Sequence, residues 1–413
     1  MTPPRRLHGR ILETWQEGAL TSMALLAGAE RHVVRGLRAG APLAPGDIVE
    51  VELGDGGAPP VVLRAGGPAA GAWDPGGDAL RWRQPGRAPS RMALLFQRQA
   101  ILRAVRDYFF EQGFLEVQAP LLVKGACPDA HLSPMRAEGG YLTTSTEYQI
   151  KRMIVGGFEK VFTLTQNFRG GDVGARHNPE FTMLEWARAF APLDAIEDDV
   201  EAFVQRALDA VSPGAEHVQV RGSAVRLAGV RWERLTVREA LAQHLGVHVD
   251  PSFSAASLRA AAARPDLGVP ERFLDDPPMV LSMLLDRVTE HLGHERPVFL
   301  REWPALMTSS AALSPGSPAL ALRSELFIAG MELSDGFPSL RDPEVQAAMF
   351  ARENARRAQE GKAPVELDAR YVEALRQGIP PGAGMALGFD RLVMLLTGQE
   401  HIRDVLAFTW DEL

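Results

Sequence analysis

The 413-residue sequence contains little cysteine, few aromatic residues and no surplus of positive charge. Cys127 is the single cysteine, which excludes a disulfide framework and a cysteine-ligated metal site within the chain. We expect it to be a small apolar residue in a reducing cytosol. The net charge of −8 argues against a generally basic protein that coats nucleic acid.

Long hydrophobic runs are also absent. No window approaches the roughly 18 uninterrupted apolar residues of a membrane span, and residues 1–10 have no apolar segment behind their arginines. We therefore expect a soluble protein of the cytoplasm, without a membrane partner. The length leaves room for two or three domains, and the 46% hydrophobic content can supply a full core.

Residues 1–88 read as a separate, all-β unit. Short strand-like runs alternate with Gly and Pro turns at the spacing typical of a small barrel, and we predict an OB-like fold. The runs cover residues 9–15, 22–30, 32–37, 47–54 and 60–66. Residues 80–90, rich in Pro, Gly and Arg, are predicted to be the linker to a second domain over residues 89–413.

The second domain begins with a predicted helix over residues 94–112 that ends at Gly113. A strand over residues 113–123 follows and is broken by Pro120. Further on, Asp129 and His131 could be read as a metal pair, but a Pro-Asp turn with local hydrogen bonds is the simpler interpretation.

Residues 141–158 run from a short strand into a helix. Ser145 or Thr146 is the predicted N-cap, and Glu147 lies in the first turn. A carboxylate there favours the positive end of the helix dipole, which is a sufficient structural reason for Glu147.

The stretch 158–190 is predicted to be a long-looped antiparallel hairpin with strands over residues 161–169 and 180–186. Strand periodicity places Phe181, Met183 and Glu185 on one face. Arg169 and His177 would share that concavity, which suits a ligand carrying both a phosphate and an amine. The alternative is a surface hairpin with an ordinary ion pair.

Residues 191–295 carry no assignable chemistry. Amphipathic patterns predict helices over residues 193–211 and 237–247, whereas residues 264–278 look like a loop. We expect this region to be an insertion packed beside the catalytic sheet.

Two acidic residues recur near residue 330. If Ala329 and Gly330 form a two-residue turn, Phe327 pairs with Glu332, and Glu325 lies diagonally opposite Glu332 on the same face. Two such carboxylates repel each other unless a cation lies between them, and Mg²⁺ bound with nucleotide phosphates fits a sparse oxygen site. Two solvated strand glutamates are the alternative.

Residues 382–398 are predicted to be a strand that turns into a helix with Arg391 in its first turn. Gly384 and Gly388 would let the backbone lie close to a flat base. The helix residues Leu392, Val393, Leu395 and Leu396 are expected in the core.

Several of these segments resemble one known family. The string FRGGDVGARHNPEFTMLEW is similar to motif 2 of class II aminoacyl-tRNA synthetases, in the form found in lysyl-tRNA synthetases and their relative, the elongation factor P lysine ligase. GAGMALGFDRLVMLLTG resembles motif 3, and residues 94–123 resemble motif 1, the homodimer interface of the family. The resemblance implies an α+β class II synthetase catalytic domain with an antiparallel sheet flanked by helices, and a homodimer.

The resemblance also implies roles for single residues. Arg169 and Arg391 would be catalytic and grip the phosphates of ATP from opposite sides, and Glu325 and Glu332 would hold Mg²⁺. The implied ATP-binding residues further include His177, Asn178, Phe181 and Gly388, and the implied amino-acid-binding residues are Glu147, Glu185, Asp335, Phe337, Ser339 and Ala386.

Three departures concern substrate choice. Gly171 stands where motif 2 has a Glu that contacts adenine, so base selectivity is loosened or supplied by Asp172. Ser339 stands where the lysine-specific enzymes place a Glu against the distal ammonium, and Ala187 where they place a Tyr. Asp335 replaces an Asn and is expected to keep one negative charge in the pocket.

The sequence therefore predicts an ATP-dependent ligase that activates lysine, or a lysine-like amino acid such as β-lysine, as an adenylate. The expected acceptor is a lysine of elongation factor P. From residue 1 to residue 72 the only aromatic residue is Trp15, so the barrel is poorly equipped to read an anticodon. tRNA charging, ligation to a small molecule or carrier protein, and a catalytically weakened regulatory protein remain the alternatives.

Overall fold

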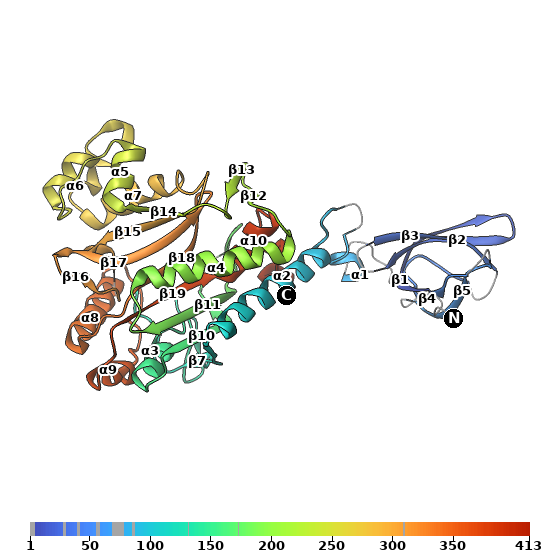
Figure 1. Cartoon of the computed structure of the whole chain (residues 1–413), viewed down its shortest axis with the longest axis horizontal. Coiled ribbons are helices and arrows are strands. Elements are labelled where there is room, and N and C mark those ends of the chain that lie inside the picture. Colours follow the sequence, from blue (N-terminus) through green and yellow to red (C-terminus); the bar gives the residue numbers. More distant parts are fainter. Residues whose placement is uncertain are drawn as a thin grey trace. The chain divides into compact units, whose positions relative to one another are not determined.

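The computed structural model of the chain describes residues 5–27, 30–38, 42–54, 58–67, 78–84, 87–130, 132–171, 173–308 and 310–413. The backbone divides into two compact units, Met1–Gln99 and Ala100–Leu413. The division falls within helix α2 (Arg91–Glu111), which matches the helix predicted over residues 94–112 (Figure 1). The helix ends before Gly113, whose φ of 76° suits a residue without a side chain.

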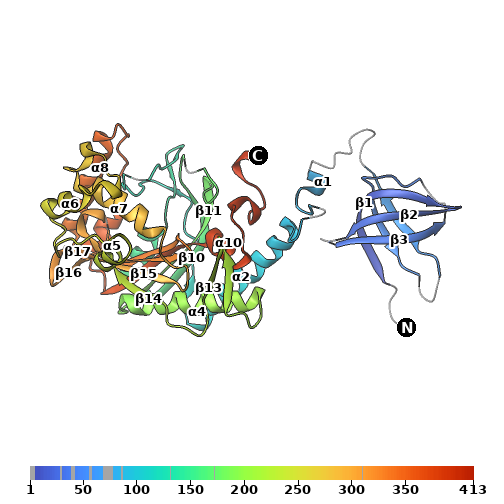
Figure 2. The ribbon, with the colours of Figure 1, turned by 90° about the horizontal axis from the view of Figure 1, so that it is seen from above.

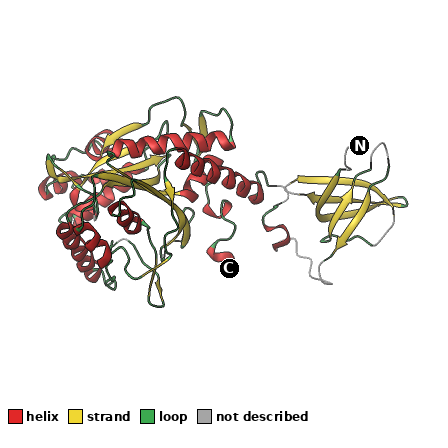
Figure 3. Cartoon of the chain, turned by 60° about the horizontal axis from the view of Figure 1, so that its bottom comes forward, coloured by secondary structure: helices red, strands yellow, loops and turns green. Residues whose placement is uncertain are grey.

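A five-stranded antiparallel sheet forms the first unit (Figure 3). Register shifts in the pairs β1–β2, β2–β3 and β4–β5 increase its curvature, and β3 also approaches β5, so the sheet curls into the predicted OB-like barrel. Its core contains Ile11, Met23, Leu25, Val34 and Val51. The strands, in the order β3-β2-β1-β4-β5, are β1 (Arg6–Glu17), β2 (Leu20–Ala27), β3 (Glu30–Arg38), β4 (Ile48–Glu52) and β5 (Val61–Gly66).

The predicted linker is only partly irregular. A short helix, α1 (Asp78–Arg81), includes its first residues, where Asp78 pairs with Arg81 at 2.6 Å and Leu80 is buried. Residues 82–84 and 87–90 form neither helix nor strand.

A nine-stranded sheet organises the second unit and confirms the α+β class. Most neighbours are antiparallel, but β14 pairs with β15 and β6 with β10 in parallel. The order is β14-β15-β17-β18-β19-β11-β10-β6, and β16 pairs with β17. The strands are β6 (Leu115–Glu116), β10 (Lys160–Phe168), β11 (Glu180–Ala189), β14 (Glu233–Thr236), β15 (Val298–Pro304), β16 (Leu313–Ser314), β17 (Ser317–Ile328), β18 (Met331–Pro338) and β19 (Gly382–Gly388).

Helices cover both faces of this sheet. The neighbouring residues Val161 and Phe162 point to opposite faces, since side chains alternate along a strand. Phe162 packs with residues of α2, α4 and α10, whereas Val161 packs with residues of α3, α8 and α9. Figures 1 and 2 show α4 lying along the sheet. These helices are α3 (Glu147–Val155), α4 (Leu193–Val211), α8 (Pro343–Gln359), α9 (Ala369–Arg376) and α10 (Phe389–Thr397).

The region 191–295 is more than an insertion beside the sheet. The predicted helices are present as α4 and α5 (Val237–Leu245), but β14 is an edge strand of the main sheet itself. The predicted loop 264–278 holds two 3₁₀ turns and the start of a helix that periodicity did not reveal. The remaining elements here are β12 (His217–Val220), β13 (Ser223–Arg226), α6 (Ala255–Ala262) and α7 (Pro277–Thr289).

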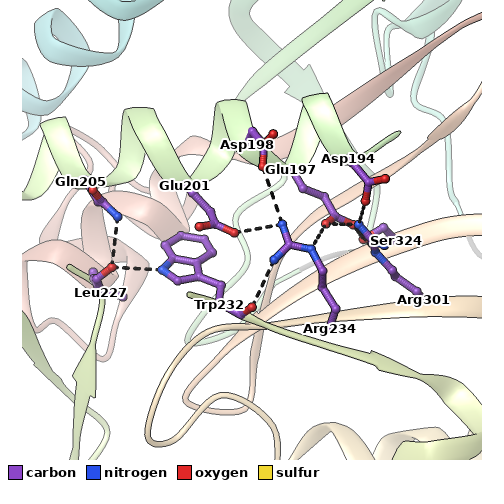
Figure 4. A network of polar contacts seen from close by, with 10 residues as sticks. All are labelled: Asp194, Glu197, Asp198, Glu201, Gln205, Leu227, Trp232, Arg234, Arg301 and Ser324. Carbon is purple, nitrogen blue, oxygen red and sulfur yellow. Dashed lines mark hydrogen bonds and ion pairs between the residues drawn. The ribbon is translucent and has the colours of Figure 1, made fainter. Parts of the chain in front are cut away.

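A buried carboxylate on helix α4 binds this helix to the sheet. Glu197 of α4 is fully buried and accepts hydrogen bonds from Arg234, Arg301 and the Ser324 hydroxyl, which come from β14, β15 and β17 (Figure 4). Because each partner comes from a different strand, one carboxylate ties three strands to one helix.

Three short strands, β7 (Leu122–Val123), β8 (Arg136–Ala137) and β9 (Gly140–Leu142), form a separate sheet. The interruption between β6 and β7 includes Pro120, as predicted. Among the described residues, no helix combines the length and apolar character required to span a bilayer.

Candidate functional site

A cavity of about 490 Å³ opens on the sheet face that α3 and α8 cover. Every lining residue falls between Cys127 and Ile402, within the second unit. The lining includes all predicted site residues except Glu325, namely Glu147, Arg169, His177, Asn178, Phe181, Glu185, Glu332, Asp335, Phe337, Ser339, Ala386, Gly388 and Arg391.

The phosphate-binding candidates Arg169, His177, Asn178 and Arg391 all line this cavity. Arg169 directly follows β10 and lies over the Phe181 ring, with 5.1 Å between the guanidinium carbon and the ring centroid. Arg391, in the first turn of α10, donates to the Glu332 carbonyl at 2.8 Å and contacts His177 Nε2 at 2.5 Å. Two arginines separated by more than half of the chain thus line one cavity, as the sequence predicted.

The antiparallel hairpin predicted to carry these residues is present. β10 and β11 pair so that Asn167, Thr165 and Thr163 face Phe181, Met183 and Glu185. Asn178 in the connecting loop donates to the Glu180 carbonyl and accepts from the Trp410 N–H, and both contacts hold the loop in place. Asp172 and His131 lie outside the described residues.

Glu185 lies on the floor of the cavity and is 3% exposed. Its carboxylate accepts hydrogen bonds from the Thr146 N–H, the Thr146 hydroxyl and the Ser145 hydroxyl. Burial raises the pKa of Glu185, although these hydrogen bonds act in the opposite direction. Thr146 occupies the N-cap position of α3 without capping it, because its hydroxyl is used by Glu185.

Glu147 begins α3 and already has a partner in the protein. The Lys151 ammonium, one helical turn along, lies 2.6 Å from its carboxylate and 5.0 Å from the Phe337 ring centroid. Burial alone would lower the pKa of Lys151, but the contact with Glu147 raises it above its ordinary value.

The turn at Ala329 and Gly330 has the predicted form. Both residues have positive φ, 49° and 67°, and Phe327 pairs with Glu332 as expected. A bulge then adds one residue to β18, so Glu325 faces Asp335 directly.

The sequence predicted that Glu325 and Glu332 oppose each other, and the structure adds Arg323 beside Glu325. It donates to both oxygens of Asp335, at 2.9 and 3.0 Å, and lies 2.6 Å from Glu325. Asp335, which was expected to keep one negative charge in the pocket, is therefore paired with Arg323, which shares its single positive charge with Glu325. Burial raises the pKa of Glu325 well above its usual range despite Arg323, and the nearby Glu332 and Asp335 raise it further.

Gly384 was predicted to let the backbone lie close to a flat base, and the structure gives a different reason for a glycine at this position. A Cβ there would lie 2.8 Å from the Trp186 carbonyl oxygen, so the glycine permits the close approach of β11. Gly388 instead lies beside the Arg391 side chain.

Comparison with known proteins is consistent with this geometry. The family described as tRNA synthetases class II (D, K and N) matches residues 79–412. The elongation factor P--(R)-beta-lysine ligase of Yersinia enterocolitica is 35% identical over 329 residues, covering 77% of this chain and 95% of the relative. The ligases of the same name from Enterobacter sp. (strain 638) and Salmonella dublin are each 34% identical over 346 residues, covering 81% of this chain and 99% of the relative.

The chain belongs to the class II tRNA synthetase family. It is an enzyme of the ligase class, and the resemblance found in its sequence is confirmed.

Sequence reasoning missed several basic residues of this synthetase-like cavity. Arg176 lies next to His177 in the hairpin loop, and its pKa is lowered by burial and by the charges of Arg221 and Arg391. Lys151 follows Glu147 at the i,i+4 spacing of helix partners, and Arg323 precedes Glu325 by two residues on a strand. Both spacings were readable in the sequence.

Proposed function

We propose that the enzyme uses ATP to activate lysine or a lysine-like amino acid, (R)-β-lysine included, and transfers it to a lysine of elongation factor P. The observation that carries this proposal is the convergence of Arg169 and Arg391 in one cavity that also contains the carboxylates of Glu147 and Glu185. Phosphate oxygens suit the two arginines, and an amino group suits the carboxylate of Glu185, whereas Glu147 already pairs with Lys151. The names of the similar ligases support the same substrate and acceptor.

The reaction has two steps. The amino-acid carboxylate attacks the α-phosphorus of ATP in line, and pyrophosphate leaves as the acyl-adenylate forms. The acceptor amine then attacks the acyl carbonyl, an amide bond forms and AMP leaves. Arg169 and Arg391 stabilise charge on the phosphate oxygens, His177 and Asn178 position the phosphates, and the Phe181 ring stacks on adenine.

The carboxylates near residue 330 fit a magnesium ion bound with ATP. Glu332 is half exposed and lines the cavity, while Glu325 is buried and interacts electrostatically with it. Arg323 contacts Glu325 and Asp335 and sets one positive charge against the three acids Glu325, Glu332 and Asp335, which leaves room for a further positive charge. Among the described residues no larger group of metal-ligating side chains occurs, so the ion would be held by Glu325, Glu332 and the phosphates. Mg²⁺ would neutralise charge on the nucleotide.

The barrel favours a protein acceptor over tRNA. Trp15, the one aromatic residue between residues 1 and 72, is half buried, so the barrel offers few platforms on which bases can stack. Three arginines of the barrel strands, Arg6, Arg31 and Arg35, form ion pairs with acids on other strands of the sheet, which reduces the positive charge available to a nucleic acid. We also propose a homodimer, as the resemblance of residues 94–123 to motif 1 implies.

Amino-acid-dependent ATP–pyrophosphate exchange, screened over the natural amino acids and (R)-β-lysine, tests the first step. We expect exchange with lysine or β-lysine, and exchange with none of these acids would refute the proposal. Labelled amino acid is then offered together with purified elongation factor P or with tRNA. Label on the protein is expected, whereas label on tRNA alone would assign the enzyme to tRNA charging.

A further inference from the structure

A diamino acid presents two ammonium groups to the cavity, and a buried ammonium is costly unless a carboxylate faces it. This inference rests on the proposed function. The partners that each acid already has in the protein show which carboxylates remain for these ammonium groups. Glu147 is held by Lys151 at 2.6 Å, and Asp335 is held by both nitrogens of the Arg323 fork. Both carboxylates are thus already paired within the protein, although Arg323 shares its single positive charge between Asp335 and Glu325.

Glu332 and Glu185 also line the cavity, and each has a different partner. Glu332 is half exposed and lies beside Arg391 at the phosphate end. Glu185 accepts hydrogen bonds from neutral donors, so its charge remains available for one ammonium group. Ser339, which also lines the cavity, carries no charge. Three other carboxylates line the cavity, namely Asp129, Glu353 and Asp390, and Asp390 accepts a hydrogen bond from the Thr182 N–H.

Glu353 of α8 lines the same cavity and is only 7% exposed. Its carboxylate makes two long contacts, with the Ala130 N–H at 3.4 Å and the Arg352 Nε at 3.6 Å. Arg352 is directed to the Thr308 carbonyl at 3.0 Å, and Arg356, one turn along, pairs with Glu360 at 3.1 Å. The contacts of Glu353 with the Ala130 N–H, at 3.4 Å, and with Arg352, at 3.6 Å, are both longer than a charge-assisted hydrogen bond. The charge of Glu353 is therefore poorly compensated.

The backbone around Glu353 is well held. The next residue, Asn354, bonds the Val365 N–H and carbonyl, and Arg357 donates to the carbonyls of Asp129 and Leu132. A carboxylate on such a braced helix can be kept in one position for a ligand.

We propose that Glu353 binds the distal ammonium of the diamino-acid substrate and selects against amino acids that lack it. The reacting end of the substrate lies toward Glu185 and Arg169, and the distal amine extends toward α8. Glu353 thus supplies a negative charge that Ser339 does not provide.

The test compares Glu353→Gln with wild type in ATP–pyrophosphate exchange, using (R)-β-lysine and 3-aminohexanoic acid, which lacks the distal amine. Glu353→Gln should raise the KM for β-lysine about 30-fold and leave the KM for ATP nearly unchanged, because a buried charge pair is lost only at the amino acid. Glu353→Asp, which keeps the charge, should recover part of the affinity. Glu344→Gln, on the exposed side of the same helix, is the matched control.

The outcomes separate this inference from the proposed function. If wild type is active and Glu353→Gln resembles Glu344→Gln, the role of Glu353 is refuted while the adenylation activity stands. A wild type that uses 3-aminohexanoic acid as well as β-lysine refutes it too, without reference to any variant. If no amino acid supports exchange, both proposals fall.

Discussion

The individual side chains of the cavity owe their chemistry to their immediate partners. Arg391 contacts both the Glu332 carbonyl and His177, so its guanidinium is fixed before any ligand arrives. Glu185 keeps a buried carboxylate because three donors from the start of α3 surround it. In both cases the surrounding structure orients the functional group, which is the arrangement that transition-state stabilisation requires.

Arg391→Ala should lower the kcat of ATP–pyrophosphate exchange by about 10²- to 10³-fold, since a preorganised positive charge at the phosphates is removed. Arg403→Ala is the control, because Arg403 is exposed, pairs with Asp411 and does not line the cavity. Equal activity of the two variants would contradict the role of Arg391. Thermal unfolding of both proteins checks that the fold is intact.

Glu185 also gives a prediction for pH dependence. Its pKa is raised in the folded protein by burial, so the folded state binds the proton more tightly than the unfolded chain does. The stabilisation from the protonated acid is complete below the unfolded pKa and is lost as pH rises through the folded pKa. Glu185→Gln should therefore become progressively more stable relative to wild type as pH rises from mildly acidic to neutral. Urea unfolding across that range measures the difference, and a constant difference would contradict the prediction.

Single elements were largely predictable because their signals are local. The hairpin β10–β11, the turn at Ala329 and Gly330, and the passage from β19 into α10 each follow from periodicity and turn residues within a short window. Strand β14, the β18 bulge and helices α6, α7, α8 and α9 were not predicted. The four residues of β14 show no distinctive pattern by themselves, and their place in the sheet depends on the parallel partner β15, about 60 residues further on.

At the level of elements, α4 is held to the sheet through Glu197. Removal of this carboxylate leaves Arg234 and Arg301 without their shared buried partner, so Glu197→Ala should lower the free energy of unfolding by about 3–5 kcal/mol. Asp198→Ala, at an exposed position on the same helix and 3.8 Å from Arg234, should change it by less than about 1 kcal/mol. Urea denaturation of the two variants measures their free energies of unfolding. Similar losses for both variants would contradict a large contribution of the network in Figure 4 to stability.

At the scale of the whole molecule, the cavity belongs to one unit. All of its lining residues fall within Ala100–Leu413, and none comes from the barrel. A chain lacking residues 1–88 should therefore keep amino-acid-dependent pyrophosphate exchange within about threefold of the full-length protein, as expected when all contacts to the reacting groups are retained. Loss of exchange in a folded truncated protein would show that the barrel contributes to the first step.

The sequence by itself determined the family, the sheet-and-helix class and the segments that carry the arginines and acids, because these depend on motifs and on short-range periodicity. Only the tertiary structure decided which charges remain available to a ligand. Arg323 pairs with both Asp335 and Glu325, Lys151 pairs with Glu147, and Glu353 lines the cavity from a helix that carries no recognised motif. The physical reason is that the charge a carboxylate offers depends on the side chains packed around it in space, and those partners are chosen by the fold as well as by neighbours in sequence.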